Sequence, residues 1–266
     1  MIPKTLHYCW FGGKPMPANQ QKYIDGWRRL MPDYKIRKWS ESDIDINSVP
    51  LVKQAYESGT FAFVADYVRL YALFTEGGIY MDTDVKVYKP FDSYLGYSMF
   101  TSYEFHPGYK EYAKMLTMID RNGVRIAERD IKIPGAGLMS AIIGAEKGSP
   151  FIKDCMSIYH SMGYAELRQR NYTIPSTLAI TAEKYGFRYA NEFQLLDGNM
   201  AVFPSNIFAD YRTADKKSVA VHWPTGSWGK RKGVSGRIKS FLYRVRPIRR
   251  VYMTVRNIFE KRPLHY

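Results

Sequence analysis

The sequence predicts an α/β domain followed by a basic helical tail, and three observations lead to this prediction. Strand-like apolar segments alternate with segments of helical periodicity along most of the chain, as in layered α/β domains. The chain has 266 residues, 45% of them hydrophobic, which suffices for one domain with a sizeable core. This composition excludes disorder, a disulfide scaffold or a fibrous repeat for the whole chain. Basic residues are concentrated at the C-terminal end, so we expect a domain at 1–229 and a tail at 230–266.

Apolar runs and helix-ending residues mark the elements of the first hundred residues. Pro32 is expected to stop the first helix, and Gly77 to end the third as a glycine cap. The expected strands are Thr5–Trp10, Tyr34–Trp39, Ile79–Met81, Val85–Tyr88 and Ser98–Ser102, and the expected helices are Ala18–Leu30, Pro50–Ser58 and Phe61–Glu76.

The rest of the domain has a mixed pattern. A late strand is expected at Val219–Trp223. The expected helices are Tyr109–Met118, Leu138–Ala145, Phe151–Ser161 and Ser176–Tyr185.

The tail carries most of the formal net charge of +14. Residues 230–266 contain twelve Lys and Arg against one acid, Glu260, whereas the residues before them total +3. Apolar residues from Ile238 to Phe259 recur at three- and four-residue steps, which predicts an amphipathic basic helix interrupted at Pro247. This helix either packs its apolar stripe on the domain or docks on an anionic membrane surface. Nucleic-acid binding is a third hypothesis, but no nucleic-acid-binding motif accompanies the charge, so we expect no such partner.

Two features bear on the cellular compartment. Cys9 and Cys155 cannot form a disulfide framework and lack the spacing of a metal site, which favours a reducing compartment. The N-terminus lacks the pattern of a signal peptide, and no stretch approaches the ~20 apolar residues that span a bilayer. We therefore expect a cytoplasmic protein, which is peripheral on the inner face of the cell membrane if the tail docks there.

Two opposite charges stand in a helix that is otherwise apolar. The segment Phe61–Phe74 is apolar nearly all round, which predicts a buried helix, yet it contains Asp66 and Arg69 three residues apart on one face. Buried charges are costly unless they are paired or used. Either they form a structural ion pair, or this face borders a polar cleft where Asp66 binds sugar hydroxyls and Arg69 meets a phosphate or a hydroxyl.

Two carboxylates follow the next apolar strand. Asp82 and Asp84 are separated by one residue, and in an extended strand such residues point to the same side. Oxygen ligands on one side suit Mg²⁺ or Mn²⁺, which keep open positions for a diphosphate. A lone Asp-x-Asp is more often a solvated turn. Here the motif directly follows a buried strand, and the preceding helix carries the charged pair. This combination favours a cation-binding site over a solvated turn.

Further candidates lie at both ends of the domain. Tyr8 and Trp10 are expected at the carboxyl end of the first strand, where α/β sheets bind ligands, and Trp10 either stacks on a nucleotide base or belongs to the core. His222 ends the late strand as a Mn²⁺ ligand or as a core histidine. The hydroxyl of Ser227 and the indole of Trp228 can hold phosphate oxygens.

Taken together, these segments resemble glycosyltransferase family 32, which has a DXD sugar-binding region and is common in bacterial capsule and exopolysaccharide clusters. The family is related to yeast mannosyltransferases and clostridial glucosylating toxins. The resemblance is dense over residues 1–90 and returns at 219–228. The family often has Gly-Pro where this chain has Ile174-Pro175, and Asn around Gly135–Gly137, so its acceptor and leaving-group contacts are not carried over. The motifs are Ile2–Lys4 with His7–Gly13, Ala65–Leu73, Gly77–Val85, and His222–Trp223 with Gly226–Trp228.

The resemblance implies a GT-A fold, a nucleotide-sugar donor such as a UDP- or GDP-sugar, a divalent cation (Mn²⁺ or Mg²⁺) and retention of anomeric configuration. A saccharide or a lipid-linked saccharide would be the acceptor. Asp82, Asp84 and Arg69 would be the catalytic residues. The implied roles in chain order are base stacking by Trp10 with Tyr8 nearby, sugar contacts by Asp66 and Arg69, a donor contact by Tyr80, a ribose, sugar or metal contact by Asp82, metal ligation by Asp84, and completion of the metal and diphosphate site by His222, Ser227 and Trp228.

The sequence therefore predicts a metal-dependent glycosyltransferase that moves a hexose from a nucleotide diphosphate sugar in surface polysaccharide synthesis. A metal-dependent nucleotide-sugar hydrolase or phosphotransferase is the rival enzyme and predicts no glycoside product. A membrane-binding protein defined by its basic tail is the rival from another class. It predicts binding with steep salt dependence and no turnover.

Overall fold

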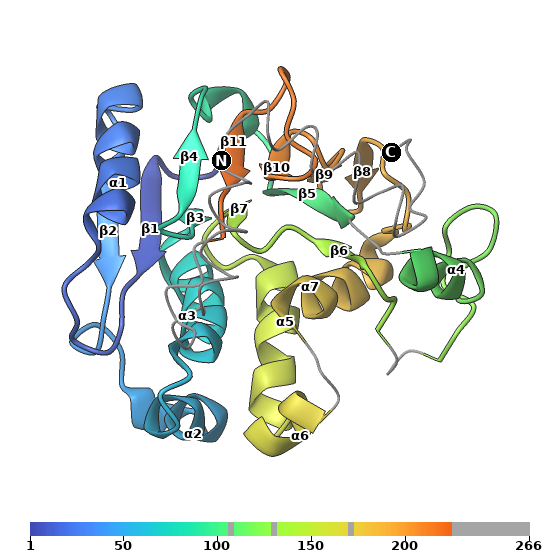
Figure 1. The fold of residues 1–266 in the computed structure, drawn as a ribbon, viewed down its shortest axis with the longest axis horizontal. Helices are drawn as coiled ribbons and strands as arrows, with labels where there is room; N and C mark the ends of the chain where they lie inside the picture. Colours follow the sequence, from blue (N-terminus) through green and yellow to red (C-terminus); the bar gives the residue numbers. More distant parts are fainter. Residues whose placement is uncertain (106–108, 129–131, 170–172, 225–266) are drawn as a thin grey trace.

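The computed structural model describes residues 1–105, 109–128, 132–169 and 173–224, and within them it confirms the α/β class. The main sheet contains β1 (Thr5–Cys9), β2 (Lys35–Trp39), β3 (Gly78–Met81), β5 (Met99–Phe105), β6 (Ala136–Leu138), β7 (Ile142–Ala145), β8 (Gln194–Leu196) and β9 (Met200–Phe203). Its order is β2-β1-β3-β7-β5-β9-β8, with β6 paired to β5 (Figure 1). The pairs β1–β2, β1–β3 and β5–β9 are parallel and the others antiparallel, so the sheet is mixed.

A second, small sheet joins distant parts of the chain. It consists of β4 (Val85–Val87), β10 (Phe208–Asp210) and β11 (Ala220–His222), with β11 in the middle. In its register His222 pairs with Val85 on one side and with Asp210 on the other. The segment that follows β3 is therefore held beside the late strand.

Helices cover both faces of the main sheet. The helices α3, α5 and α7 lie together on one face, and α2 and α6 lie at their far ends (Figure 1). On the opposite face, α1 packs against β4. The helices are α1 (Ala18–Leu30), α2 (Pro50–Glu57), α3 (Phe61–Glu76), α4 (Tyr109–Leu116), α5 (Pro150–Ser161), α6 (Tyr164–Gln169) and α7 (Ile174–Ala182), with 3₁₀ turns at Ile46–Ser48, Asp92–Tyr94 and Glu183–Tyr185.

The sequence of α3 explains both its burial and its end. Eight of its residues are buried, Arg69 among them, as expected for a helix that is apolar nearly all round. It ends at Gly77, whose φ of 68° favours glycine. A Cβ at this position would lie 2.6 Å from the backbone nitrogen of Lys147, so a side chain there would collide with the backbone that follows β7.

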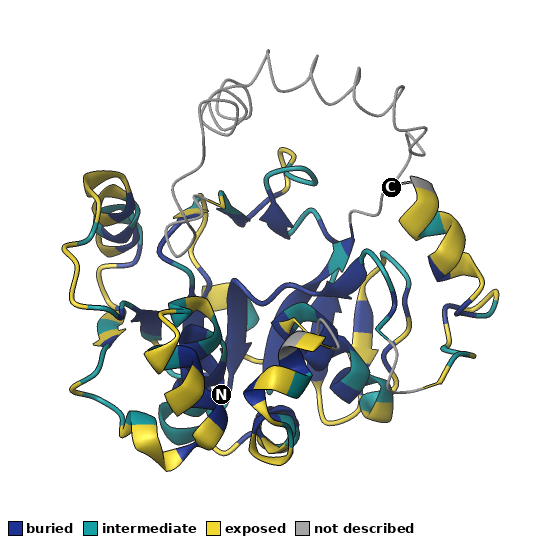
Figure 2. Cartoon of the chain, turned by 60° about the horizontal axis from the view of Figure 1, so that its bottom comes forward, coloured by how far each residue is buried: buried dark blue, intermediate teal, exposed yellow. Residues whose placement is uncertain are grey.

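The core is divided by the main sheet. One apolar cluster joins α2, α3, α5 and α7 to the sheet and includes Val64, Val68 and Leu178. The other lies on the α1 side and includes Trp27 and Phe208. Figure 2 shows the buried residues along the sheet and the inner helix faces, with exposed residues on the outer faces.

The expected helix at Leu138–Ala145 is wrong, because this segment forms the end of β6 and the whole of β7. Both strands are buried at every residue, so their apolar run has no two-residue alternation to distinguish it from a helix. The strands β8, β9 and β10 and the helix α6 were not expected either. Each has only three to six residues, too few for a periodic pattern to stand out.

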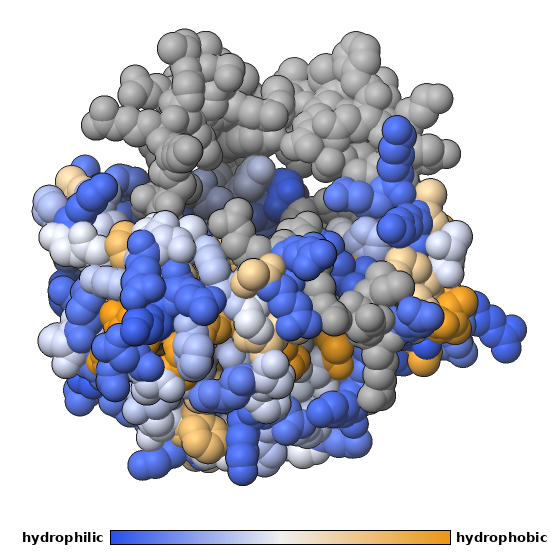
Figure 3. Space-filling view, turned by 90° about the horizontal axis from the view of Figure 1, so that it is seen from below, coloured by the Kyte–Doolittle hydropathy of each residue, from blue (hydrophilic) through white to orange (hydrophobic). Residues whose placement is uncertain are grey.

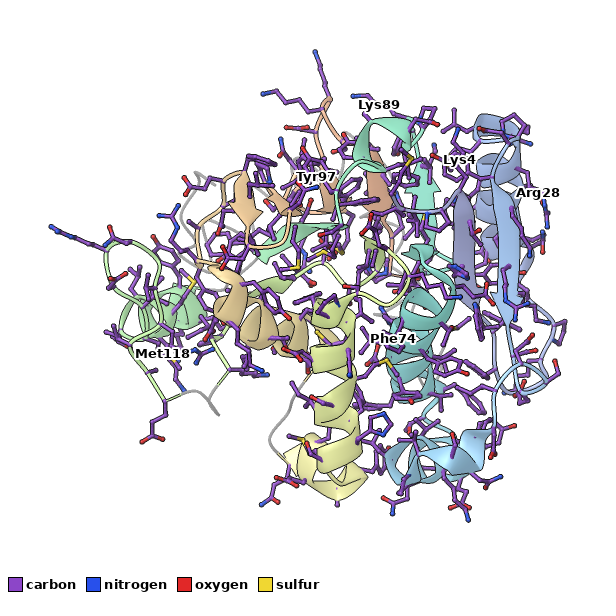
Figure 4. All side chains as sticks on the ribbon, turned by 180° about the vertical axis from the view of Figure 1, so that it is seen from behind. Lys4, Arg28, Phe74, Lys89, Tyr97 and Met118 are labelled. Carbon is purple, nitrogen blue, oxygen red and sulfur yellow. The ribbon has the colours of Figure 1, made fainter. Side chains whose placement is uncertain are left out.

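The ion pairs of Lys4 connect three outer segments at the surface. Figure 4 shows Lys4 at the side of the molecule where β1 and α1 lie, opposite Met118 and α4. The ammonium of Lys4 lies 2.5 Å from Asp33 and 2.6 Å from Asp92, which links β1 to the segment after α1 and to the turn before β5. The face formed by the outer sides of the lower helices is largely hydrophilic, with hydrophobic residues in small separate patches (Figure 3).

Among the described residues, no helix has the length and apolar character needed to span a bilayer. The tail at 230–266 lies outside these residues, and the boundary after residue 229 stays a prediction.

A buried histidine fixes the start of the sheet. The Nε1–H of Trp39 donates to Nδ1 of His7 at 3.0 Å, so the proton of His7 is on Nε2, which bonds the carbonyl of Gly77 at 2.7 Å. Burial lowers the pKa of His7 below its ordinary value, although the bond to Gly77 and the charge of Glu76 act in the opposite direction. The folded protein therefore requires this imidazole to be neutral.

We expect His7 to make stability fall in acid. Because its pKa is lower in the folded state, the unfolded chain binds the proton more readily below the unfolded pKa of about 6.5. Its contribution to the free energy of unfolding should therefore decrease between pH 7.5 and 5.5, by at most about 1.4 kcal/mol, the limit for one proton over this range. Urea denaturation of His7→Gln should show a weaker loss over this range than the wild type, whereas His160→Gln, at an exposed histidine, should not. Equal pH dependence in His7→Gln and the wild type would contradict this assignment.

Candidate functional site

Asp82 and Asp84 lie in a tight turn between β3 and β4. The Asp82 amide donates to the carbonyl of Ala141 at 3.0 Å, and the amide of Val85 donates back to the carbonyl of Asp82 at 3.0 Å. The strands expected at Ile79–Met81 and Val85–Tyr88 are present on either side of this turn. The same-side argument from an extended strand does not apply to Asp82 and Asp84 themselves, because the chain turns here from the main sheet into the small sheet. Thr83 and Asp84 are buried within the turn.

The small sheet brings His222 to this turn. Its Nε2 lies 3.1 Å from Oδ1 of Asp84 and 3.8 Å from Oδ2 of Asp82. The amide of the next residue, Trp223, donates to the carbonyl of Asp84 at 3.0 Å, which fixes the end of β11 against the turn. One candidate ligand atom from each of Asp82, Asp84 and His222 lies within 4.8 Å of the others.

The charges around His222 decide its protonation. Burial lowers its pKa, but the hydrogen bond to Asp84 and the charges of Asp84, Asp82 and Asp210 outweigh this and raise the pKa to about 9. At neutral pH His222 is therefore protonated, and its imidazolium lies against the carboxylates of Asp84 and Asp82.

This donor set fits a divalent cation. Two carboxylates and an imidazole are ligands that Mn²⁺ accepts, and a cation between them replaces the proton that His222 holds otherwise. Carboxylates alone would suit Mg²⁺ equally, whereas the imidazole favours the softer ion.

Arg69 connects α3 to the turn. Its guanidinium lies 2.6 Å from Asp66 and 3.7 Å from Asp82, donates to the carbonyl of Ser140 at 2.7 Å, and stands 4.7 Å from the ring centre of Tyr80. The expected ion pair between Asp66 and Arg69 is present, and Arg69 also faces the Asp82 carboxylate. The sugar and phosphate contacts expected of the pair stay predictions.

The carboxyl groups beside Arg69 differ in their surroundings. Burial raises the pKa of Asp66 to about 6; Arg69 opposes this shift, and Asp82 adds to it. The hydroxyl of Tyr80 donates to Oδ1 of Asp82 at 2.9 Å and so fixes one oxygen of that carboxylate. Five of the predicted site residues thus form one contiguous group with His222. These five are Asp66, Arg69, Tyr80, Asp82 and Asp84.

The two N-terminal candidates, Tyr8 and Trp10, differ in burial and in their contacts. Tyr8 is buried in the α1-side cluster, where its ring meets Trp27 edge-on at 6.2 Å between centroids. Trp10 is half-buried and donates its Nε1–H to the carbonyl of Lys14 at 2.6 Å. Ser227 and Trp228 lie outside the described residues, so their expected roles stay predictions.

Three charged residues close to the site were missed from the sequence. Asp210 is the register partner of His222, and its Oδ1 accepts the Nε–H of Arg212 at 2.6 Å. Glu104, near the end of β5, interacts electrostatically with both residues and with His222. The only sequence feature that marks any of them is the Asp210-x-Arg212 spacing after two apolar residues. This pattern is too common in protein sequences to indicate a site.

Comparison with known proteins gives a match in the region of the turn. Residues 17–101 match the family model described as "Glycosyltransferase sugar-binding region containing DXD motif". This stretch contains Asp66, Arg69, Tyr80, Asp82 and Asp84.

Three relatives align with parts of the chain. An initiation-specific alpha-1,6-mannosyltransferase of Candida albicans is 31% identical, covering 36% of this chain and 28% of its own. An uncharacterized glycosyltransferase of Acanthamoeba polyphaga mimivirus is 28% identical, covering 42% and 47%. The subversion of eukaryotic traffic protein A of Legionella pneumophila is 21% identical, covering 74% and 33%. The chain thus spans less than half the length of each of these relatives.

Solved structures with a similar arrangement include two glycosyltransferases. The PaToxG glycosyltransferase has a TM-score of 0.48 at 17% identity, with 69% of both chains covered. The galactosyltransferase LgtC, in complex with donor and acceptor sugar analogs, has a TM-score of 0.44 at 12% identity, with 82% of this chain and 86% of that chain covered. The family model and two of the relatives support a DXD-type glycosyltransferase region in this chain.

Proposed function

We propose that this chain is a metal-dependent glycosyltransferase of the GT-A type. It moves a hexose from a UDP- or GDP-sugar to a saccharide or lipid-linked saccharide acceptor, with retention of configuration, in surface polysaccharide synthesis. One observation carries the proposal: Asp82, Asp84 and His222 converge beside the Asp66–Arg69 pair, and most of this group lies in the stretch that matches the DXD model.

Each residue has a distinct task in this proposal. Asp84, Asp82 and His222 hold the cation, which when bound offsets the charge that builds on the leaving diphosphate. Tyr80 and Arg69 orient the Asp82 carboxylate through the contacts at 2.9 and 3.7 Å. Asp66, at the end of this array, accepts hydrogen bonds from the donor sugar. Retention follows from attack on the face from which the diphosphate departs, with a phosphate oxygen of the leaving group taking the proton.

A donor screen tests the function. The protein is incubated with Mn²⁺ and a panel of UDP- and GDP-sugars, with and without saccharide acceptors, and the released nucleoside diphosphate and glycoside are both measured. A glycosyltransferase releases nucleoside diphosphate and forms a glycoside. Release of nucleoside monophosphate or sugar phosphate without a glycoside would instead support the hydrolase or phosphotransferase.

Trp10→Ala is expected to weaken donor binding more than it slows the chemical step. Stacking on a nucleotide base acts equally in the ground state and the transition state, so its loss raises the KM for the donor and leaves kcat nearly unchanged. Base stacking contributes about 1–3 kcal/mol, which corresponds to a roughly 5- to 150-fold rise in KM. The measurement is a donor titration at saturating acceptor. A variant that unfolds, with a lost thermal transition, would identify Trp10 as a core residue instead.

For the tail we propose docking on an anionic membrane. Each basic residue near such a surface contributes about 1 kcal/mol, so the excess in residues 230–266 suffices for binding at low salt. Truncation after Gly229 should leave a folded protein that still acts on a water-soluble acceptor but no longer sediments with anionic vesicles. A destabilised or aggregated truncation product would indicate a tail that packs on the domain. Full-length protein that ignores anionic vesicles at low salt would exclude membrane docking.

A further inference from the structure

The outer side of the small sheet carries a shallow polar cavity of about 130 Å³. Its lining includes Tyr88 and Lys89, which follow β4, Lys216 in the loop between β10 and β11, and Trp223 after β11. The small sheet and Lys89 lie at the rim of the molecule opposite α2 and α6 (Figures 1 and 4). The cavity is therefore separate from the helices that cover the main sheet.

Two further lysines adjoin this cavity. The Nζ of Lys86 lies 4.9 Å from the ring centre of Tyr88, and the Nζ of Lys89 donates to the carbonyl of Lys217 at 3.2 Å. These contacts join the end of β4 to the loop between β10 and β11 in one surface. This surface is named the basic face, and it consists of Lys86, Tyr88, Lys89, Lys216, Lys217 and Trp223.

The basic face has an unbalanced positive charge. Its four lysines are exposed, and none of them forms an ion pair with a carboxylate of the part of the chain that the structure describes. Lys4, by contrast, is paired with both Asp33 and Asp92. Asp215 is the one acid among the described residues that line the cavity, so four positive charges face one negative charge, a net +3. Such an excess attracts an anionic partner.

The aromatic rings between the lysines indicate which anionic partner fits. Tyr88 is 41% exposed, and the ring of Trp223 stacks on Tyr211 with 6.2 Å between centroids. Tyr and Trp combine an apolar ring with a polar end, and they are enriched where proteins meet lipid headgroups. Lysine places its ammonium at headgroup phosphates while its apolar stem covers the surface below them. Lysines interleaved with such rings therefore suit an anionic phospholipid surface.

The basic face lies close to both the metal site and the tail. Successive residues of a strand point to opposite faces of a sheet, so Val221, which lines the cavity, and His222 point to opposite sides of β11. The basic face is thus back to back with the candidate metal site. The tail begins at residue 230, seven residues after Trp223 in the sequence, and a segment of that length spans at most about 25 Å. A membrane that holds the tail is within reach of the basic face.

We infer that the basic face is a second membrane contact, made by the α/β domain itself, which binds the headgroups of an anionic phospholipid surface. Its lysines meet the headgroup phosphates, and Tyr88 and Trp223 lie at the boundary with the acyl chains. A tail alone would leave the domain free to rotate, whereas the tail and the basic face together fix its orientation on the membrane. This inference goes beyond the proposed docking of the tail, and it does not depend on the reaction that the metal site performs.

Vesicle sedimentation of the full-length protein tests the charge of the basic face. The wild type should bind vesicles of phosphatidylglycerol and phosphatidylcholine more tightly than vesicles of phosphatidylcholine alone. The triple variant Lys86→Gln, Lys216→Gln, Lys217→Gln should bind the anionic vesicles roughly 20- to 100-fold more weakly, because each lysine near such a surface contributes about fivefold. A thermal melt checks that the variant is folded.

A matched triple variant controls for net charge. It removes the same three charges from exposed lysines of α2, α4 and α5, at a distance from the small sheet. Because exposed charges are screened beyond a Debye length of about 8 Å, its binding should stay within about threefold of the wild type. The substitutions are Lys53→Gln, Lys114→Gln and Lys153→Gln.

A fluorescent reporter tests which surface meets the lipid. Tyr88→Trp places an indole on the basic face, and Leu116→Trp places one on α4, both at exposed positions. Anionic vesicles with brominated acyl chains should quench the fluorescence of Tyr88→Trp more than that of the wild type. Leu116→Trp should show no such added quenching.

Each other result would overturn the inference. Equal binding of the two triple variants would mean that net charge or the tail alone holds the protein on the vesicle, and added quenching in Leu116→Trp but not in Tyr88→Trp would place another surface on the lipid. Release from vesicles by inorganic phosphate at constant ionic strength would indicate a site for a free anion. Tighter binding of duplex DNA than of vesicles, lost in the first triple variant, would indicate a nucleic-acid surface. None of these measurements uses turnover, so the donor screen decides the proposed reaction separately.

Discussion

Replacing Asp84 with alanine is expected to abolish sugar transfer while the fold is preserved. Asp84 offers one of only three protein ligands in the described site, and its Oδ1 also lies 3.1 Å from Nε2 of His222. Metal stabilisation of a leaving diphosphate contributes several kcal/mol, so the rate of transfer should fall at least 100-fold, the equivalent of about 2.8 kcal/mol. The measurement is the release of nucleoside diphosphate over a Mn²⁺ titration, together with circular dichroism and a thermal melt.

The control for this variant is Asp197→Ala, which removes an exposed carboxylate between β8 and β9. It should retain wild-type turnover and the wild-type dependence on Mn²⁺. Near-wild-type turnover of Asp84→Ala, with an unchanged Mn²⁺ requirement, would show that the cation is held by other groups and would contradict the assignment of the site.

Arg69→Met is expected to have the largest effect on stability. Arg69 is buried and contacts Asp66, Asp82 and the carbonyl of Ser140, so its loss leaves carboxylates without their counter-charge in a poorly solvated site. Breaking a buried ion pair by removing one partner typically costs 3–5 kcal/mol, and we expect a decrease of about this size in the free energy of unfolding. Transfer activity should be lost as well, because the orientation of Asp82 depends on the same guanidinium.

The double variant Asp66→Asn, Arg69→Met separates the energy of the Asp66–Arg69 ion pair from the other effects of removing Arg69. Because the amide needs no counter-charge, the double variant should be more stable than Arg69→Met alone, which a double-mutant cycle measures by urea denaturation. The deficit of Arg69→Met should also shrink as the pH falls toward about 6, because Arg69 holds down the pKa of Asp66 in the wild type and without it this carboxyl takes up a proton at a higher pH. Arg29→Met, at an exposed arginine of α1, is the matched control. A cost below about 1 kcal/mol, as for a surface pair, would contradict this account.

Local patterns were sufficient for much of the fold and part of the site. The apolar run of α3, interrupted by Asp66 and Arg69, predicted a buried helix with a charged face, and both residues are at the candidate site. The buried strand before Asp82 favoured a cation site at Asp82 and Asp84, and the two carboxylates do lie together in the turn that follows β3. These features depend on neighbours in sequence, whose spacing sets helix faces and turn positions directly.

Other features could not be predicted because burial or chain separation hides them. The segment Leu138–Ala145 is buried on both faces, so its pattern did not distinguish strand from helix. The basic face combines lysines from β4 and the residues after it with lysines from the loop between β10 and β11, and neither segment carries a pattern that places them together.

The sequence by itself determined the α/β class, the buried helix with its charged pair, and the carboxylates that follow a buried strand. Only the tertiary structure decided that His222 would lie 3.1 Å from Asp84, and that Arg69 would meet Asp82 as well as its helix neighbour Asp66. The position of His222 depends on the pairing of β4 with β11, which brings together two segments far apart in the chain. Such pairing is selected by the burial of whole strands in a common core, and this property belongs to the folded chain rather than to any stretch of its sequence.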